Sequence, residues 1–370
     1  MNAMGIVFAN IYDSSLGQLT NKRTIASLPY GGRYRQIDFT LSNLCNAGIR
    51  RVGVITKYNY QSMMNHIGSG QEWGLELEEG GLEYLTPFAM GPSGSYRGKL
   101  EALHSALAYL QSAPQQEVVL ADSNVLCNID LTQVLQHHRQ SGLDVTVVCK
   151  SGIANGVKQL DLALRLQEGR VTDLAADYCA GPEYEASMGI FVMGRELLIR
   201  WVEESVARSR YRFERDLVLQ GFCRGSLTVG AFPFDGVAMF NESPREYFQN
   251  NLALITREIR HDLFRPERTV YTKTRDQVPT YYGREAEIGN CIVADGCRLY
   301  GKASDSVLFR GVTLEPGAKL RSCVILQDCR LGAGAELTHV ILDKNVTVHP
   351  GVRLCGTMDN PVIVERGAVI

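Results

Sequence analysis

A six-residue step in the apolar residues runs through the C-terminal part of the chain. It links Val312, Ala318 and Val324; Leu314, Leu320 and Leu326; Cys329, Ala335 and Ile341; Val340, Val346 and Val352; and Val348 and Leu354. One coil cannot bury its apolar face alone, whereas stacked coils bury a continuous column. We therefore predict a left-handed parallel β-helix of hexapeptide repeats over residues 285–370. An ordinary antiparallel β domain is the alternative. Because a solenoid needs a cap or a partner over its end coils, we expect an oligomer.

Before this repeat, strand and helix patterns alternate. Apolar runs predict strands at 5–9, 51–56, 118–121 and 145–149, and helical spacing covers 37–45, 101–110, 130–140, 196–206 and 244–257. This alternation predicts a mostly parallel, Rossmann-like α/β sheet with helices on both faces. We place the α/β domain at residues 1–257 and a linker at 258–284. A solvated helix end explains the charged stretch 257–268 equally well.

Composition narrows the class of protein. Apolar residues make up 45% of the chain and charged residues 21%, as in ordinary soluble proteins. The 38 basic and 40 acidic residues nearly balance, so nothing favours a nucleic acid or an anionic membrane as partner. Neither a signal peptide nor an apolar run of about 18 residues is found, so we expect no membrane span. The ten cysteines form no C-x-x-C pair, which favours reduced thiols in a cytoplasmic protein.

The loop after the first predicted strand lies where α/β proteins usually bind nucleotides, at the carboxyl edge of the sheet. A loop that holds phosphate groups needs glycines, because its backbone N–H groups must come close to the anion. Residues 10–15 read NIYDSS, with no glycine and no basic residue, and Asp13 adds a negative charge. The position of this loop favours a nucleotide, whereas its chemistry opposes one.

Several motifs resemble the glucose-1-phosphate adenylyltransferase (ADP-glucose pyrophosphorylase) family over essentially the whole chain. They are LTNKR at 19–23, PYGGRYR at 29–35, IDF at 37–39, LSN at 41–43, NAGI at 46–49, YRG at 96–98, ASMGI at 186–190 and SVLFRGV at 306–312. The resemblance implies a nucleotidyltransferase domain followed by a hexapeptide domain. It also implies a reaction that joins ATP and glucose 1-phosphate into ADP-glucose and pyrophosphate, with Mg²⁺, for glycogen or starch synthesis.

The chain departs from this family where the reaction would take place. Asn10, Ile11 and Asp13 stand at glycine positions of the family's phosphate loop, and Ser15 and Ile25 stand where the family has an arginine and a lysine. Pyrophosphoryl transfer spreads negative charge over phosphate oxygens, and cations stabilise that charge. At about 1.5–3 kcal/mol for each charge-assisted hydrogen bond, the loss of two weakens ATP binding by orders of magnitude.

The metal position is also altered. The family's Mg²⁺ aspartate corresponds to Ser123, one residue after Asp122. A one-residue shift along a strand turns a side chain to the other face, so Asp122 could substitute only if the strand end kinks. The second metal aspartate falls near Phe240, and Asp235 is nearby but out of register. Because serine is a poor Mg²⁺ ligand, we predict neither a catalytic residue nor a metal site here. Turn or capping roles explain Asp122 and Asp235 better.

On the sugar-phosphate side, Tyr96 and Ser187 match residues that contact glucose 1-phosphate in the family. Packing within a strand is an equal alternative for Ser187. The family's lysine for the sugar phosphate has no counterpart, because no lysine occurs between Lys158 and Ser187.

One basic cluster, formed by Lys22, Arg23, Arg33 and Arg35, surrounds two glycines. Such a cluster can hold a phosphate through charge-assisted hydrogen bonds. In the family, the residues that match Lys22, Arg23 and Arg35 serve the allosteric site for phosphorylated effectors. A face that forms salt bridges with a partner or a neighbouring domain is the alternative.

With this eroded transfer site, the chain resembles the second, regulatory-type subunit of the two-subunit bacterial ADP-glucose pyrophosphorylase. The resemblance implies a catalytically degenerate subunit that joins a catalytic sister chain in a heterotetramer for glycogen synthesis. On this interpretation Mg²⁺ belongs to the catalytic partner, and this chain binds no cofactor of its own. A working adenylyltransferase with an altered loop and a stand-alone sugar-phosphate sensor are the alternatives. Assays of the chain alone and mixed with the sister chain separate the first two hypotheses, and co-elution with the sister chain excludes the sensor.

Overall fold

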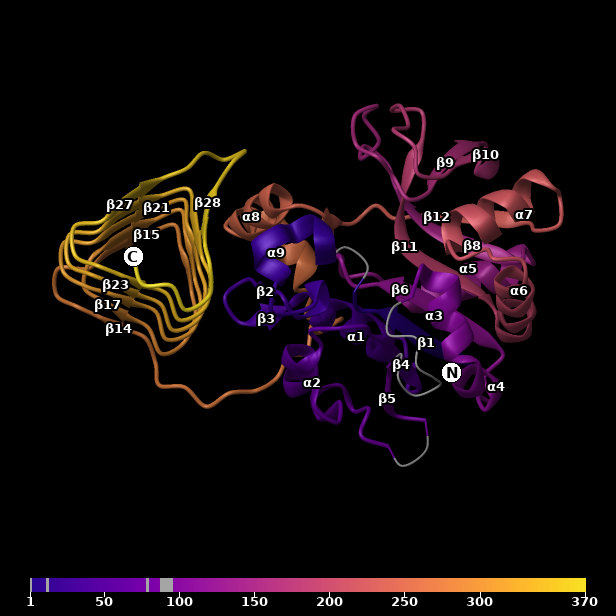
Figure 1. Ribbon diagram of the computed structural model, residues 1–370, viewed down its shortest axis with the longest axis horizontal. Helices are drawn as coiled ribbons and strands as arrows, with labels where there is room; N and C mark the ends of the chain where they lie inside the picture. Colours follow the sequence, from indigo (N-terminus) through magenta and orange to yellow (C-terminus); the bar gives the residue numbers. More distant parts are fainter. Residues whose placement is uncertain (1, 11–12, 78–79, 87–95) are drawn as a thin grey trace.

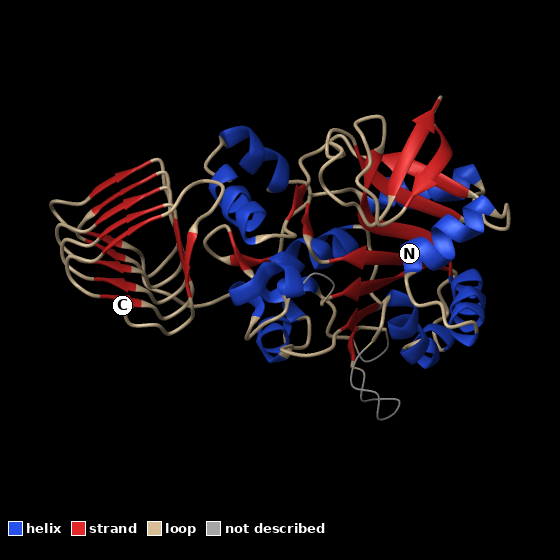
Figure 2. Ribbon diagram, turned by 45° about the horizontal axis from the view of Figure 1, so that its top comes forward, coloured by secondary structure: helices blue, strands red, loops and turns tan. Residues whose placement is uncertain are grey.

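A computed structural model describes residues 2–10, 13–77, 80–86 and 96–370 of the chain. An α/β domain and a β-helix lie side by side in it, with helix α8 between them (Figure 1). Figure 2 shows the sheet of the first domain with helices against it, and the second domain as a stack of coils.

One nine-stranded sheet organises the described part of the first domain. Its strands are β1 (Ala3–Phe8), β4 (Val52–Ile55), β5 (Leu82–Leu85), β6 (Glu117–Asp122), β8 (Val145–Lys150), β9 (Ala163–Gln167), β10 (Arg170–Ala175), β11 (Glu185–Gly194) and β12 (Val229–Pro233). The order is β10-β9-β11-β6-β1-β4-β5, and β8 joins β11 to β12. The pairs β1–β4, β1–β6, β4–β5 and β8–β12 are parallel, whereas β11 runs antiparallel to β6, β8 and β9. The predicted α/β sheet is confirmed, with β11 as an antiparallel strand in its centre.

Helices cover both faces of this sheet. They are α1 (Gln36–Asn46), α2 (Gln61–Ile67), α3 (Lys99–Ser105), α4 (Leu107–Gln111), α5 (Leu131–Ser141), α6 (Arg195–Ala207) and α7 (Gln220–Cys223). Helices α8 (Pro244–Ala253) and α9 (Arg257–Leu263) follow the last strand of this sheet in the chain. Met4, Ile6 and Phe8 of β1 pack with α3, α4 and α6, while Ala3 and Val7 pack with α1, α2 and α5. Successive side chains of a strand point to opposite faces, so a strand covered on both sides is apolar throughout. No helix in these described ranges is long and apolar enough to span a bilayer.

Shorter elements complete the first domain. They are the 3-10 segments η1 (Asp13–Thr20), η2 (Ile25–Ser27) and η3 (Gln71–Trp73), the π-helical segment η5 (Phe213–Leu219), and the strands β2 (Pro29–Tyr30), β3 (Tyr34–Arg35), β7 (Val125–Leu126) and β13 (Met239–Phe240). The stretch predicted as a linker, 258–284, contains all but the first residue of α9 and also β14, the first strand of the β-helix.

Three parallel five-stranded sheets form the second domain. The first holds β14 (Tyr281–Tyr282), β17 (Arg298–Leu299), β20 (Thr313–Leu314), β23 (Arg330–Leu331) and β26 (Thr347–Val348). The second holds β15 (Glu287–Gly289), β18 (Lys302–Ser304), β21 (Lys319–Arg321), β24 (Glu336–Thr338) and β27 (Arg353–Cys355). The third holds β16 (Ile292–Val293), β19 (Val307–Leu308), β22 (Val324–Ile325), β25 (Val340–Leu342) and β28 (Val362–Val364). This arrangement confirms the predicted left-handed parallel β-helix.

The six-residue step does not mark one inward column throughout. Leu314 and Leu320 point into the β-helix, but the following position of this column is taken by Ile325, five residues after Leu320, and not by Leu326. Leu326, Val324 and Ile341 lie instead in a cluster shared with the first domain. The corner before the third sheet is one residue shorter than a hexapeptide, and its left-handed residues include Ser322 (φ 49°). The predicted six-residue columns are therefore wrong at Val324, Leu326 and Ile341, which face the first domain.

The outer face of the third sheet packs on the first domain. Val307, Phe309, Val324, Leu326 and Ile341 from the β-helix share one fully buried cluster with Leu16, Leu19, Ile25, Leu28, Tyr247 and Phe248. Apolar contact of this extent is the main force that joins two domains. It holds η1 and the residues after it against the β-helix, which places the predicted basic cluster at the domain boundary.

Candidate functional site

In the described part of the loop after β1, the polar side chains of Asn10 and Asp13 bond to each other and to nearby backbone groups. Asn10 Nδ2 donates to the Asp13 carboxylate, and Asn10 Oδ1 accepts a hydrogen bond of 2.8 Å from the Lys57 backbone N–H. Asp13 Oδ1 accepts from the Ile25 backbone N–H at 2.7 Å. Burial raises the pKa of Asp13 to about 6, although the bond from Ile25 opposes that rise. The Asp13 carboxylate therefore holds the Asn10 side chain and the start of η2, while Ile11 lies outside the described residues.

A cavity of about 280 Å³ opens beside this loop, at the carboxyl ends of β1 and β4. We call it the transfer cavity. Its lining mixes apolar residues of the sheet with several charged side chains: Lys57, Arg97, Lys99, Asp161, Asp177, Arg212, Glu214 and Arg215. Such a cavity has the position and size to admit part of a nucleotide.

The basic residues that line the transfer cavity are all engaged. Their partners are Glu101 for Arg97 (2.7 Å), the Tyr96 carbonyl for Lys57 (3.1 Å), Asp177 for Arg212, Asp216 for Arg215 (2.9 Å), and Asp122 (2.7 Å) and Glu214 for Lys99. Carboxylates already neutralise Arg97, Lys99, Arg212 and Arg215, whereas Lys57 bonds a backbone carbonyl. Charge-assisted bonds to a ligand are correspondingly weaker here than from unpaired cations.

Lys99 is the most deeply buried of these cations. Burial alone lowers its pKa, but the carboxylates of Asp122 and Glu214 outweigh that effect and raise the pKa above its ordinary value. Burial raises the pKa of Asp122 in turn, against the attraction of Lys99. Lys99 therefore stays protonated and neutralises the acids around it.

Ser123 and Asp122 point in different directions at the end of β6. The Ser123 hydroxyl donates to the Phe8 carbonyl at 2.9 Å and is buried, so it faces the neighbouring strand. Asp122 faces a small cavity of about 20 Å³, which Glu214 and Glu242 also line. The two neighbouring positions thus differ: the Ser123 hydroxyl bonds to the adjacent strand, whereas the Asp122 carboxylate faces the small cavity.

Asp235 does not reach that small cavity. It is exposed on the loop after β12, where its backbone carbonyl accepts from Lys150 Nζ at 3.3 Å. The acids beside Asp122 are instead Asp161, Glu214 and Glu242. Sequence reasoning missed these three because they come from separate segments and no spacing links them. Within the described ranges, no group of three or more His, Cys, Asp or Glu side chains is arranged to hold a metal ion.

The two residues predicted to contact a sugar phosphate have internal partners. The Tyr96 ring is buried, and its hydroxyl accepts from Ser105 Oγ at 2.9 Å. Ser187 Oγ accepts from the Gly189 backbone N–H at 3.2 Å, within the bulge of β11. Ser187 lines the small cavity and Tyr96 lines neither cavity, so the structure does not bring the two together.

Lys158, the lysine nearest in sequence to the missing sugar-phosphate ligand, is also held by acids. Its Nζ lies 3.0 Å from Glu242 and 2.8 Å from Glu246, and 5.0 Å from the centre of the Phe240 ring. Like Lys99, it is a lysine at the cleft that two carboxylates neutralise.

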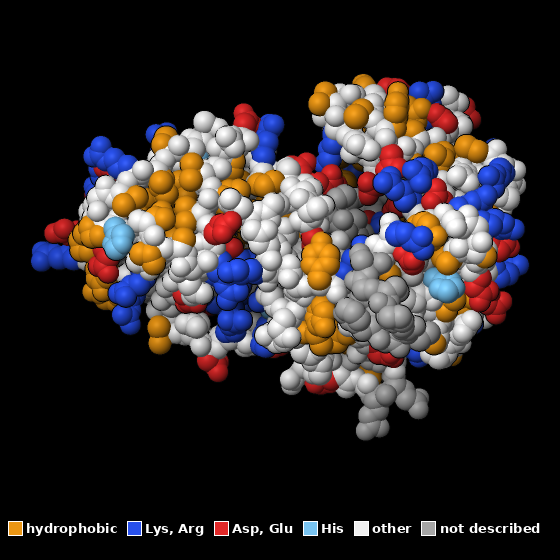
Figure 3. All heavy atoms as spheres, viewed as in Figure 1, with side chains coloured by type: hydrophobic (Ala, Val, Ile, Leu, Met, Phe, Trp, Pro, Cys, Tyr) orange, Lys and Arg blue, Asp and Glu red, His pale blue; other side chains and the backbone are white. Residues whose placement is uncertain are grey.

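A second cavity, of about 400 Å³, lies between the α/β domain and the β-helix. We call it the boundary cavity. Its basic lining residues are Lys22, Arg33, Arg35, Arg275, Arg310, Lys344 and Arg366, and Asp328 is the one acid among its described lining residues. In the part of the chain that the structure describes, none of these cations forms an ion pair. Figure 3 shows lysine and arginine side chains gathered where the two domains meet.

The cations of the boundary cavity repel one another. Burial, opposed by Asp38 and aided by neighbouring arginines, lowers the pKa of Arg35 to about 10. Burial and the nearby Arg33 likewise lower the pKa of Arg310, whose buried Nε has no hydrogen-bond partner in the described part of the chain. Burial and Arg35 lower the pKa of Lys344 to about 6. A bound anion would relieve this repulsion, so the cavity has the electrostatics of an anion site.

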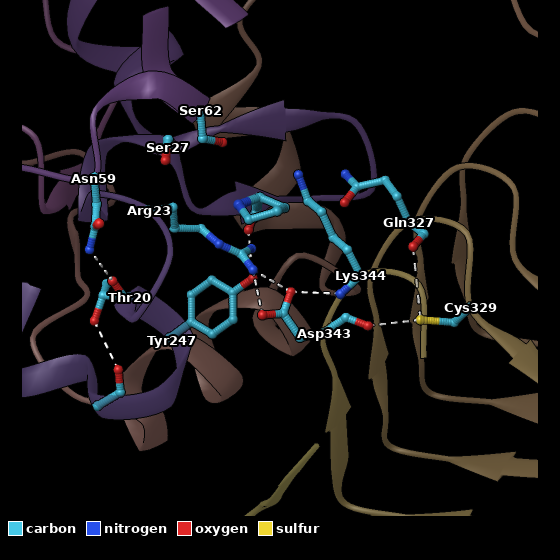
Figure 4. Close-up of polar contacts among 12 residues, drawn as sticks. Thr20, Arg23, Ser27, Asn59, Ser62, Tyr247, Gln327, Cys329, Asp343 and Lys344 are labelled. Carbon is cyan, nitrogen blue, oxygen red and sulfur yellow. Dashed lines mark hydrogen bonds and ion pairs between the residues drawn. The ribbon is translucent and has the colours of Figure 1, made fainter. Parts of the chain in front are cut away.

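Arg23 is set apart from the other three members of the predicted basic cluster. Its guanidinium is buried and pairs with the Asp343 carboxylate, and it does not line the boundary cavity. Figure 4 shows the Arg23 side chain reaching from the first domain to Asp343 on the β-helix, with Lys344 beside them. The structure thus places Arg23 in an ion pair across the domain boundary, next to the cavity that Lys22, Arg33 and Arg35 line.

Comparison with known proteins agrees with both domains. Residues 12–223 match the nucleotidyl transferase family, and residues 276–360 match the GlmU-like C-terminal hexapeptide family. The chain is 34% identical to the glycogen biosynthesis protein GlgD of Geobacillus stearothermophilus and 29% identical to that of Bacillus subtilis, in each case over 99% of this chain and 96% of the relative. It is 28% identical to the glucose-1-phosphate adenylyltransferase of Thermotoga neapolitana, over 86% of this chain and 76% of the relative. The chain belongs to the glucose-1-phosphate adenylyltransferase family.

Membership of the adenylyltransferase family implies a Mg²⁺ ion in the transfer cavity, but the residues present do not fit one. The hydroxyl of Ser123 is bonded to a backbone carbonyl and the Asp122 carboxylate to Lys99. Mg²⁺ demands several oxygen ligands, some of them water, around a small ion. In this member of the family, an ammonium group occupies the space beside the carboxylate.

Proposed function

We propose that this chain is a regulatory, non-catalytic subunit of a cytoplasmic glucose-1-phosphate adenylyltransferase for glycogen synthesis. It would assemble with a catalytic sister chain, as a heterotetramer, and bias that chain's turnover in response to an anionic effector. The relatives named as glycogen biosynthesis proteins and as adenylyltransferases support this proposal.

One observation carries the proposal: the contrast between the two cavities. Four of the five basic residues of the transfer cavity are paired with carboxylates. Among the described residues, those of the boundary cavity form no ion pairs, although Arg35 donates hydrogen bonds to Ser62. Unpaired cations bind phosphate groups, and paired ones must first exchange a partner. A chain with this distribution is suited to sense a phosphorylated molecule and poorly suited to stabilise a breaking triphosphate.

An active enzyme with a diverged loop is the second candidate. The 280 Å³ transfer cavity favours it, because space for part of a ligand remains at the carboxyl end of β1. Catalysis by this chain would require the cations around that cavity to exchange their present partners for phosphate oxygens.

Formation of ADP-glucose from ATP, glucose 1-phosphate and Mg²⁺ separates these candidates. We expect the purified chain alone to be at least about 100-fold slower than the catalytic sister chain, since losing one stabilising donor already costs a factor of about 10²–10³. We also expect the two chains to co-elute in size-exclusion chromatography and the mixture to differ from the sister chain in turnover or effector response. Turnover by the chain alone that equals the sister chain's would overturn the proposal, and failure to co-elute would favour a stand-alone sensor.

The effector part of the proposal has its own variant pair. Arg310→Gln removes a cation that lines the boundary cavity, and Arg298→Gln removes an exposed cation from the first sheet of the same β-helix. We expect Arg310→Gln to weaken the effector response of the mixture about tenfold, as one charge-assisted bond predicts, and Arg298→Gln to leave it unchanged. If the two variants gave the same effector response, the boundary cavity would not be the effector site.

A further inference from the structure

Three segments converge on the ammonium group of Lys99. Lys99 opens α3, Asp122 ends β6, and Glu214 lies in η5. Lys99 Nζ donates to Asp122 Oδ2 at 2.7 Å and to Glu214 Oε1. Only 9% of the Lys99 side chain is exposed, with 3% of Asp122 and 13% of Glu214, so these charges interact in a site that is nearly closed to water.

Aromatic rings complete the enclosure of this ammonium group. Lys99 Nζ lies 5.4 Å from the centre of the Phe8 ring and 5.8 Å from that of Phe191. The faces of aromatic rings attract an ammonium ion, but they offer no oxygen ligand to a metal ion. Carboxylates and aromatic rings together surround Lys99 Nζ, and this combination suits an ammonium group better than a metal ion.

The far side of Asp122 is closed as well. A Cβ placed on Gly189 would lie 2.3 Å from Asp122 Oδ2, so the backbone of the β11 bulge already touches the carboxylate. The adjoining cavity has a volume of only about 20 Å³. One water occupies about that much space, whereas Mg²⁺ keeps several waters when it binds a protein. Asp122 Oδ1 is buried and has no hydrogen-bond partner among the described residues, which leaves one acceptor on the carboxylate unsatisfied there.

From these contacts we propose that Lys99 is a built-in cation that takes the place of a divalent metal ion at Asp122 and Glu214, and so keeps Mg²⁺ out of the transfer cavity. One fixed positive charge neutralises part of the charge that these two carboxylates would otherwise present to a metal ion. Removal of the ammonium group would leave both carboxylates, beside Asp161, without their cation. The proposal rests on the contacts of Lys99 and needs no partner chain. It can therefore be tested independently of the regulatory function.

Binding of Mn²⁺ to the full chain, followed by the electron paramagnetic resonance signal of the free ion, tests this proposal. The variants are Lys99→Met and, as a matched control, Lys57→Met, which removes another lysine from the lining of the same cavity. We expect Lys99→Met to bind Mn²⁺ at least tenfold more tightly than the wild-type chain and Lys57→Met to match the wild type. Addition of Asp122→Asn to Lys99→Met should abolish the gain.

Two results would overturn the proposal. One is a folded Lys99→Met chain that binds Mn²⁺ no more tightly than the wild type does. The other is wild-type binding of Mn²⁺ that Asp122→Asn weakens, and this second measurement does not depend on whether Lys99→Met folds. If Lys99→Met is unstable without metal, the proposal requires Mn²⁺ to raise its melting temperature through binding to the native state, and no rise would count against it. None of these readouts involves catalytic activity, so a chain without activity can still refute the role of Lys99.

Discussion

Lys344 illustrates how a single residue can make the boundary cavity sensitive to pH. It follows Asp343 on the β-helix and faces the cavity that Arg35 and Arg366 also line. Burial and the neighbouring cations lower its pKa to about 6, so the side chain is largely neutral at pH 7. An anion bound beside Lys344 would favour the charged form and raise that pKa. Binding of the anion would then take up a proton at any pH between the two pKa values.

The affinity for an anion should therefore fall as pH rises above 6. Linkage limits the change to about tenfold per pH unit for one proton, and the affinity should level off below pH 6. Sulfate is the suitable probe, because its charge is constant over this range, and isothermal titration calorimetry from pH 5.5 to 8 measures its binding. Burial, opposed by Asp38, lowers the pKa of His66, another lining residue, below its ordinary value. Lys344→Met should flatten the profile, and a wild-type affinity that rises with pH would contradict this account.

The bulge in β11 is the element that brings a backbone against Asp122. The pairing of β11 with β8 shifts between Ser187 and Ile190, and Gly189 within the bulge has a φ of +66°. Only glycine adopts that conformation at low energetic cost, and only glycine leaves room for the Asp122 carboxylate. The motif at 186–190 therefore needs a glycine at position 189, because a side chain there would overlap the Asp122 carboxylate.

Gly189→Ala should destabilise the chain more than Gly225→Ala does. Both glycines have a left-handed φ, of +66° and +64°, so both variants carry a backbone strain of about 1–2 kcal/mol. A Cβ at Gly225 meets no described atom within 4 Å, whereas one at Gly189 overlaps Asp122, which adds about 1–3 kcal/mol of overpacking. Urea unfolding followed by circular dichroism measures the difference. Equal losses from the two variants would show that the bulge can move away from Asp122.

At the scale of the whole molecule, an apolar face and one buried ion pair join the two domains. The outer side chains of the third β-helix sheet pack on η1 and α8, and Arg23 crosses the boundary to Asp343. Both side chains of the ion pair are 3% exposed, so each charge depends on the other for its partner. Removal of one partner would leave a buried charge uncompensated.

Asp343→Asn should therefore weaken the docking of the β-helix on the α/β domain. We expect a loss of about 3–5 kcal/mol, the usual cost of breaking a buried pair from one side. The control is Glu336→Gln, which breaks surface ion pairs with Lys319 and Arg353 on the same β-helix and should change stability little. Differential scanning calorimetry gives the stability, and small-angle X-ray scattering shows whether the domains separate. A loss no greater than that of the control would mean that the apolar face alone holds the domains.

Periodicity in the sequence was sufficient to predict both fold classes. Alternating apolar strands and helices predict the sheet, and the six-residue step predicts the β-helix, because both patterns report which side of a local element is buried. The departures at Asn10, Asp13 and Ser123 are also visible in the sequence, since they concern the type of side chain at a matched position. The shortened corner was not predictable in this way, because Val324 and Leu326 are as apolar as the inward residues and differ only in which core they enter.

The state of the charged residues was decided by the tertiary structure alone. Arg23 and Asp343 are 320 residues apart in the chain, and the sequence around each residue gives no sign that the two form a pair. Lys99 meets Asp122 and Glu214 only because α3, β6 and η5 converge at one edge of the sheet. Spacing along a chain determines which face a side chain takes on its own element. The partner across an interface depends on how distant elements pack, and that packing determines which cations here are paired and which are left for an anion.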